Sequence, residues 1–262
     1  MRLGEASLPA IPGNEGVGLL ADGTRVYFER TIAPFGSFAE RALVDAALPI
    51  RLPEALDDGA ALTIGIPGLA GWLALESAAA LAPGESVLVL GASGPVGHVS
   101  VQAARLLGAG RVVAAARDLA AIEPLRALGA ADAVVSLEGD AAAALRAAAG
   151  EGFDVVIDPL FGAPLVAALG ATAPGARVVS VGASAGPTAT IARALLNGRS
   201  LLTYGNRTMP VAAKRAAYER MAGHVLAGEL VVAQHERVPL ERFAEAFDRQ
   251  LAAPHRKLVL VP

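Results

Sequence analysis

A short glycine-rich stretch of the chain could bind phosphate. The sequence VLVLGASGPVG, from Val87 to Gly97, joins four branched apolar residues to a turn in which Ala92, Gly94 and Gly97 have the spacing A/G-x-G-x-x-G. In dinucleotide-binding turns the second glycine lets the backbone approach a pyrophosphate, and the third lets a helix pack closely on the strand. Free N–H groups and the helix dipole then favour the anion. The alternative is a tight strand-to-helix turn that binds no cofactor.

A second feature, about 20 residues further on, would select the cofactor. The stretch AAARD places Ala116 at the tip of the next apolar run, followed by Arg117 and Asp118. A site for NAD usually carries a carboxylate here for the ribose 2′-OH, whereas a guanidinium suits the 2′-phosphate of NADPH. We therefore expect NADPH at Arg117, with NADH open because of Asp118. The alternative has Arg117 in solvent and Asp118 capping the next helix.

The elements that must position these groups alternate regularly between Val87 and Tyr204. Apolar runs of strand length occupy residues 86–91, 111–116, 132–137, 153–158, 176–182 and 200–205. Alanine-rich stretches with a helical pattern occupy residues 95–108, 119–129, 140–150, 163–173 and 188–198. The runs are continuously apolar, which indicates a parallel sheet that helices cover on both faces. The pattern predicts an α/β fold with a doubly wound Rossmann sheet.

The two flanking segments follow other patterns. Residues 1–66 contain short alternating stretches separated by proline and glycine, which indicate antiparallel strands and loops. Residues 205–262 read as helix, strand, helix and strand. We expect this last segment to return and pack on the first. The prediction is therefore a dinucleotide-binding domain at residues 67–204, inserted in a β-rich domain that the other two segments form.

The composition excludes several classes of protein and site. The chain has 262 residues, a net charge of -3 and no basic cluster, so we expect no nucleic-acid partner. It has no cysteine, and its four histidines lack ligand spacing, so we expect no metal. The longest chargeless run, Gly59–Leu75, is shorter than the roughly 20 apolar residues of a spanning helix. The beginning of the chain has no signal pattern. We expect a soluble cytoplasmic protein with no membrane partner.

Eight stretches carry a family resemblance and follow one another in the family's order: Pro12–Gly18, Gly36–Val44, Leu81–Gly97, Gln102–Asp118, Leu128–Val135, Asp154–Gly162, Gly175–Gly182 and Lys257–Pro262. Through them the chain resembles the zinc-free, quinone-oxidoreductase-like branch of the medium-chain dehydrogenase/reductase superfamily. The resemblance implies a Rossmann domain inserted in a GroES-like catalytic domain, with NAD(P)H between them. Relatives have several strands and a substrate-contacting loop before the segment LPAIPG. We therefore expect a partial GroES-like domain here and assign no catalytic residue.

The resemblance also implies cofactor contacts at the pyrophosphate, the 2′-phosphate, the length of the dinucleotide and the nicotinamide. In that order the residues are Ser93, Gly94, Pro95 and Val96; Arg117; Asp158, Leu160, Val181, Gly182 and Ala183; and Asn206. Zinc-dependent relatives carry a histidine ligand where this chain has Asn14. Family members often form homodimers by joining Rossmann sheets at their edges. We expect the same here at residues 200–205, because an exposed apolar edge needs cover.

Several functions are compatible with these residues. The leading one is an NADPH-dependent oxidoreductase that transfers hydride, without a metal, to a quinone or another small electrophilic acceptor with an activated C=C–C=O group. An enoyl-thioester reductase of the same superfamily is a close alternative, and a non-catalytic NADPH-binding module is another. A hydrolase is also formally possible, because GASAG at residues 182–186 matches G-x-S-x-G, and Ser184, Asp248 and His255 follow in a suitable order.

Overall fold

The chain forms two units in a computed structural model that describes residues 9–232, 235–252 and 257–262. Met1–Ile66 and Val211–Pro262 form one unit, which we call the split unit. Pro67–Pro210 form the other, which we call the central unit. Helix α2 (Ile66–Leu73) begins at the boundary, and the π-helical turn η1 (Ala74–Ala78) follows it.

A parallel sheet of six strands forms the centre of the central unit. Its strand order is β6-β5-β4-β7-β8-β9, so the chain builds outward from the middle in one direction and then in the other. The strands are β4 (Ser86–Leu90), β5 (Arg111–Ala116), β6 (Ala133–Ser136), β7 (Phe153–Asp158), β8 (Thr172–Ser180) and β9 (Ser200–Thr203). The predicted fold class, an α/β chain with a doubly wound parallel sheet, is confirmed.

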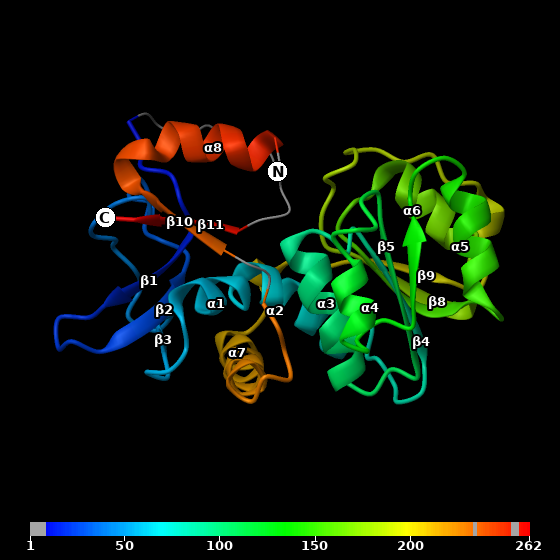
Figure 1. Cartoon of the computed structure of the whole chain (residues 1–262), viewed down its shortest axis with the longest axis horizontal. Coiled ribbons are helices and arrows are strands. Elements are labelled where there is room, and N and C mark those ends of the chain that lie inside the picture. The colour runs from blue at the N-terminus through cyan, green and yellow to red at the C-terminus, as the bar shows by residue number, and fades with distance from the viewer. Residues whose placement is uncertain (1–8, 233–234, 253–256) are drawn as a thin grey trace. The chain divides into compact units, whose positions relative to one another are not determined.

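Helices cover both faces of this sheet. They are α3 (Pro95–Leu106), α4 (Glu123–Ala127), α5 (Ala141–Ala149) and α6 (Gly162–Leu169). The first two lie on one face and the last two on the other (Figure 1). In the middle of the sheet Leu88 pairs with Val113 on one side and Val156 on the other, and all three are fully buried. Burial on both faces explains why the middle positions of strands such as β4 are apolar.

One predicted helix is wrong. Residues 188–198 form a loop that contains only a 3-10 turn, η2 (Arg193–Leu196). The β-branched residues at positions 188, 190 and 191 lose side-chain freedom in a helix. The segment is largely exposed, so little packing would offset these penalties. The preceding helix also ends earlier than predicted, because Thr172 already begins β8.

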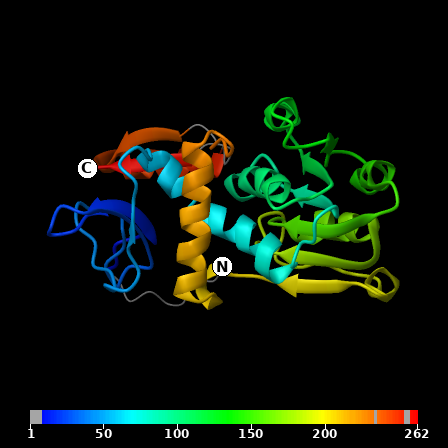
Figure 2. The ribbon, with the colours of Figure 1, turned by 90° about the horizontal axis from the view of Figure 1, so that it is seen from below.

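The described residues of the split unit form two small sheets and three α-helices. The sheets are β1 (Glu15–Leu19), β2 (Arg25–Glu29) and β3 (Ile50–Arg51), which are antiparallel, and β10 (His235–Pro239) and β11 (Lys257–Val261), which are parallel. The helices are α1 (Asp58–Thr63), α7 (Val211–Leu226) and α8 (Phe243–Ala252). Strands β10 and β11, orange and red, lie side by side (Figure 1, Figure 2). Within the described residues, the last segment follows the predicted order of helix, strand, helix and strand.

Polar contacts join the first and last segments of the split unit. Lys257 on β11 donates from Nζ to Glu15 Oε1 on β1 at 2.7 Å. Lys214 on α7 forms a buried ion pair with Glu29 on β2. The ring of Tyr27 on β2 stacks on the ring of Tyr218 on α7, with 4.7 Å between the centroids. These contacts tie together residues that are about 185 to 242 positions apart in the sequence.

Candidate dinucleotide-binding site

The glycine turn after β4 has the local geometry of the predicted motif. A Cβ added at Gly97 would lie 2.3 Å from the carbonyl oxygen of Gly91, so close packing of α3 on the strand requires this glycine. A Cβ added at Gly94 would meet only that same oxygen, at an ordinary 3.5 Å. The fold thus explains Gly97 and leaves Gly94 free of any packing demand from the described residues. A glycine at position 94 would leave room for a ligand to approach the backbone closely.

The first turn of α3 is open to an anion. Gly94 is the N-cap, and no described side chain caps the helix there. Pro95 has no N–H, and the first helical bond runs from His98 N–H to the Gly94 carbonyl at 2.9 Å. Ser93, Pro95 and Val96 are half-buried. Burial lowers the pKa of His98, which favours its neutral form. An anion at this turn would interact with the positive end of the helix and its free N–H groups.

The tip of β5 places a free cation beside a buried strand end. Ala116 is buried, and Arg117 is exposed and forms no hydrogen bond or ion pair with any described residue. The Asp118 carboxylate accepts a long hydrogen bond, 3.3 Å, from the N–H of Ala121, three residues further along the chain. On the next helix Arg126 is paired with Glu123. The guanidinium of Arg117 is thus available for an anionic ligand.

The loops after β7 and β8 are bonded to each other. The N–H groups of Val181 and Ala185 donate to the carbonyls of Asp158 and Leu160, both at 2.8 Å. The predicted residues differ in their exposure: Gly182 and Ala183 are exposed, Leu160 and Val181 are half-buried, and Asp158 is fully buried. Burial raises the pKa of Asp158, although the N–H groups of residues 161 and 160 act in the opposite direction. A ligand would touch this loop pair at its backbone, not at the carboxylate.

Asn206 lies just past the end of β9. It is half-buried and begins the 3-10 turn η3 (Asn206–Thr208). Two residues earlier, Tyr204 donates its N–H to the Ser180 carbonyl at 2.9 Å. This bond fixes the segment beside the end of β8. All six strands are parallel, so the glycine turn, Arg117, the two bonded loops and Asn206 share the carboxyl edge of one sheet. That edge is where open α/β sheets bind their ligands.

Sequence reasoning missed some of the residues that build this edge. Gly91 has a φ of +59°, and Phe161 has a φ of +58° although it is not a glycine. Ser180, which is buried, donates its hydroxyl to the Gly182 carbonyl at 3.2 Å. Gly91 could have been found from the sequence, because a glycine directly after an apolar run indicates a turn. The sequence held no signal for the other two.

The hydrolase alternative finds no support among the described residues. The Ser184 hydroxyl donates to the Pro159 carbonyl at 3.2 Å and so serves to hold a loop. Asp248 lies on α8 in the split unit, whereas Ser184 belongs to the central unit. His255 lies outside the described residues.

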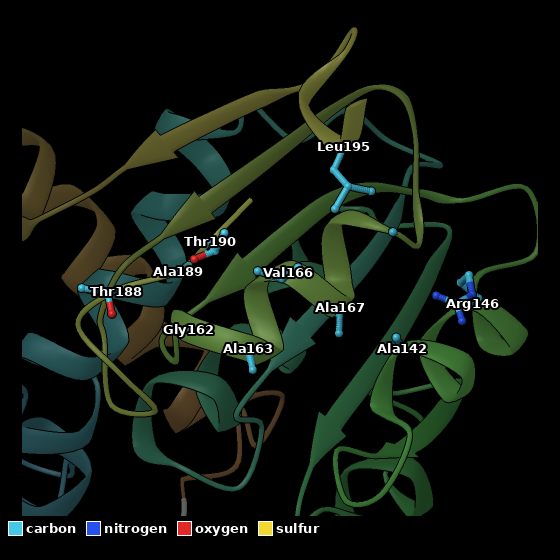
Figure 3. Close-up of a pocket in the computed structure, with 11 residues that line it drawn as sticks. Ala142, Arg146, Gly162, Ala163, Val166, Ala167, Thr188, Ala189, Thr190 and Leu195 are labelled. Carbon is cyan, nitrogen blue, oxygen red and sulfur yellow. The ribbon is translucent and has the colours of Figure 1, made fainter. Parts of the chain in front are cut away.

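A separate cavity of about 550 Å³ runs along the flank of α6. Figure 3 shows Arg146 and Ala142 from α5 near one end and Thr188 at the other, with Gly162 and Ala163 between them. None of the predicted cofactor residues lines this cavity. Among the described residues there is also no group of three acidic or histidine side chains that could hold a metal ion. No described helix is long and apolar enough to cross a membrane.

Known proteins place this chain in a family. Residues 95–221 match the domain family described as zinc-binding dehydrogenase. The chain is 30% identical over 259 residues to quinone oxidoreductase of Sus scrofa, in an alignment that covers 92% of this chain and 76% of that protein. The chain belongs to the quinone-oxidoreductase-like branch of the medium-chain dehydrogenase/reductase superfamily. Relatives of that branch that match this chain carry the name quinone oxidoreductase.

Other relatives show how far the likeness extends. The crystal structures of the quinone oxidoreductase from Thermus thermophilus and its complex with NADPH match with a TM-score of 0.76 and 32% identity, covering 95% of this chain and 80% of that one. Acrylyl-CoA reductase of Ruegeria pomeroyi is 33% identical over 195 residues, which cover 72% of this chain and 58% of that protein. The chain also matches polyketide synthases, of which it spans 2% to 11% of the length.

Proposed function

We propose that the chain is a reductase that uses NADPH to transfer hydride to a quinone or another activated C=C–C=O acceptor, without a metal. The observation that carries the proposal is the free guanidinium of Arg117 at the tip of β5, on the same sheet edge as the uncapped start of α3. One group suits the 2′-phosphate and the other suits the pyrophosphate. The Thermus thermophilus relative, solved as a complex with NADPH, supports the same cofactor.

Each element of the edge has a part in this proposal. When bound, the nicotinamide supplies a hydride to the electron-poor carbon of the acceptor. The N–H groups at the start of α3, with Ser93 and Val96, hold the pyrophosphate against Gly94. Leu160, Val181 and the exposed backbone at Gly182 and Ala183 line the dinucleotide, and Asn206 orients the nicotinamide. The acceptor is already polarised by its carbonyl group, and a proton from solvent completes the reduction.

The acceptor could instead be an enoyl thioester. The relative from Ruegeria pomeroyi, whose name specifies an acrylyl-CoA reductase, favours this second candidate. Both candidates need the same cofactor, so only the acceptor separates them. A non-catalytic NADPH-binding module is the third possibility, and it would bind NADPH without oxidising it.

A titration and an assay test these proposals together. Fluorescence titration of the purified chain should give a lower dissociation constant for NADPH than for NADH. Oxidation of NADPH should then be followed with a panel of quinones and with short 2-enoyl-CoA esters. Turnover of the quinones supports the first candidate, turnover of the thioesters alone supports the second, and binding without turnover supports the third. Absence of NADPH binding would refute all three.

We also propose a homodimer and a cytoplasmic location. Strand β9 lies at the edge of the sheet and pairs with β8, and no described strand covers its other side. Its Leu201 and Leu202 are half-buried, so pairing with β9 of a second copy would bury more apolar surface. Light scattering at several concentrations should give the mass of two chains, and a proline at position 202 should yield monomers. A monomer in the unmodified chain would refute the dimer.

A further inference from the structure

A fully buried carboxylate lies at the carboxyl end of the central strand β7. Asp158 Oδ1 accepts the N–H groups of Leu160 and Phe161, each at 2.9 Å. Its other oxygen, Oδ2, is buried and forms no hydrogen bond with any described residue. The nearby Ser180 hydroxyl donates elsewhere, to the Gly182 carbonyl. A buried charge without a counter-ion is unfavourable, so this side chain calls for an explanation.

The two bonds hold a loop that the backbone alone would not favour. Phe161 has a φ of +58°, in the left-handed region that bulky residues rarely adopt. Phe161 is also the residue from which α6 begins. Because Asp158 binds the N–H groups of Leu160 and Phe161 together, it fixes the turn between the strand and this helix.

The fixed turn is in contact with two other loops of the sheet edge. The carbonyls of Asp158, Pro159 and Leu160 accept N–H groups from the loop after β8, at 2.8, 3.3 and 2.8 Å. On its other side the turn rests on the glycine loop after β4. A Cβ added at Gly91 would lie 2.9 Å from Leu160 Cδ2 and 3.2 Å from Pro159 Cγ. One turn therefore sets the positions of three loops.

We propose that Asp158 is a positioning residue, whose Oδ1 holds the loops after β4, β7 and β8 in the arrangement that binds the dinucleotide. The inference rests on the proposed function, because only a bound dinucleotide needs these three loops at once. Asp158 is too deeply buried to touch a ligand itself. Its effect passes through the backbone of Leu160 and of the loop after β8. What the loops need from it is an acceptor oxygen, and they do not need its charge.

The experiment compares two variants of Asp158 with a matched control on the same strand. Asp158→Ala removes the acceptor, and Asp158→Asn keeps an acceptor oxygen without the charge. The control is Asp154→Ala, at the other end of β7, where Oδ2 accepts two bonds from Ser86, both at 2.8 Å. The control thus also loses two hydrogen bonds, but at the amino edge of the sheet. Hydrogen exchange without cofactor and the dissociation constant of NADPH are measured for all three.

Asp158→Ala should speed exchange at the amides of Leu160, Phe161, Val181 and Ala185, and should weaken NADPH binding about tenfold. Asp158→Asn should restore both properties to within about twofold of the unmodified chain. The control should lose stability without changing either. Unchanged loop exchange in Asp158→Ala, or equal effects in the control, would overturn the inference. If Asp158→Ala does not fold, a folded Asp158→Asn with mobile loops and weak NADPH binding would also overturn it.

The proposed function can fail separately. If the unmodified chain does not bind NADPH, the proposed function is refuted, and exchange of the cofactor-free loops still decides whether Asp158 positions them.

Discussion

The central unit and the split unit are stabilised in different ways. The central unit has strands whose buried positions are mostly apolar, such as Val87 to Leu90 on β4. The split unit instead relies on polar contacts between distant segments, such as Lys214 with Glu29 and Lys257 with Glu15. It also carries most of the large apolar side chains that are exposed within the described residues, among them Phe35, Leu43, Phe247 and Leu251.

This difference has consequences for both units. Apolar burial is non-directional and spread over many residues, so one changed side chain removes a small share of it. A buried ion pair is stabilising only while both partners are present. Loss of one partner is therefore costly at the buried pair of the split unit, whereas polar contacts of the central unit, such as Glu85 with Arg177, are only half-buried.

The largest expected effect is on the buried ion pair. Lys214→Met would leave Glu29 buried without its partner, and removal of one partner from such a pair destabilises a protein by about 3–5 kcal/mol. Arg30, whose Nε lies 3.9 Å from Glu29 Oε1, places the expected value toward the lower end. Chemical denaturation measures the free energy of unfolding. The double variant Lys214→Met with Glu29→Leu should recover most of the loss. A single variant as stable as the unmodified chain would contradict the comparison.

A smaller effect is expected from crowding in the central unit. Gly97→Ala would place a methyl group 2.3 Å from a backbone oxygen, and overpacking of this kind typically costs about 1–3 kcal/mol. Gly94→Ala is the matched control, because its methyl group would make only an ordinary contact at 3.5 Å. Thermal denaturation should separate the two variants, and NADPH titration should show that Gly94→Ala weakens binding while remaining stable. Equal stability of both variants would show that α3 does not pack as described.

The charge at the tip of β5 should affect binding without affecting stability. Arg117→Ala should weaken NADPH about tenfold, which corresponds to about 1.4 kcal/mol, and should leave NADH nearly unchanged. The control is Arg126→Ala, because that guanidinium is already paired with Glu123. Fluorescence titration gives the dissociation constants of both cofactors for the unmodified chain and the two variants. An unchanged NADPH constant in Arg117→Ala would mean that this side chain does not contact the bound cofactor.

The smallest effect concerns the N-cap of α1 and its dependence on pH. Burial acts to raise the pKa of Asp57, but the N–H groups of Ala60 and Gly59 and the charges of His235 and Arg237 outweigh it and lower the pKa below 3.8. The ionised form is therefore the one that stabilises the fold. Its contribution is present above that pH and is lost as the pH falls through the lowered value.

Asp57→Ala should lower the free energy of unfolding by under about 1 kcal/mol near neutral pH, since the side chain is nearly half exposed. The difference from the unmodified chain should shrink as the pH is lowered below 3.8. Urea denaturation at a series of pH values measures it. If the difference in the free energy of unfolding instead grew as the pH fell, the ionised form of Asp57 would not be the stabilising one, and the prediction would be refuted.

Much of the central unit could be predicted from the sequence because its strands are buried on both faces. Burial of that kind demands apolar residues at every position, and the six runs were recognised by this property alone. The failure at residues 188–198 shows the limit of the same reasoning. Alanine and leucine gave the segment a helical pattern, while its β-branched residues and its exposure decided against a helix.

The candidate site was less predictable in its details. Gly94, Gly97 and Arg117 follow from spacing, because their chemistry depends on position relative to a strand. Asp158 also follows a strand, and nothing in the sequence distinguishes a carboxylate that faces a ligand from one that turns inward to its own loop. The unusual φ of Phe161 and the bonds between the loops after β7 and β8 depend on pairs of residues that are distant in the sequence.

The bonds between those two loops also limit how the protein can be redesigned. The loop after β7 supplies carbonyls, and the loop after β8 supplies the matching N–H groups at Val181, Ser184 and Ala185. Transplanting one loop from a relative would leave unpaired backbone groups on the other, at a place where two of the three bonds are short. The two loops therefore form a single module for grafting, and a chimera that exchanges both is the rational starting point for altering what this sheet edge binds.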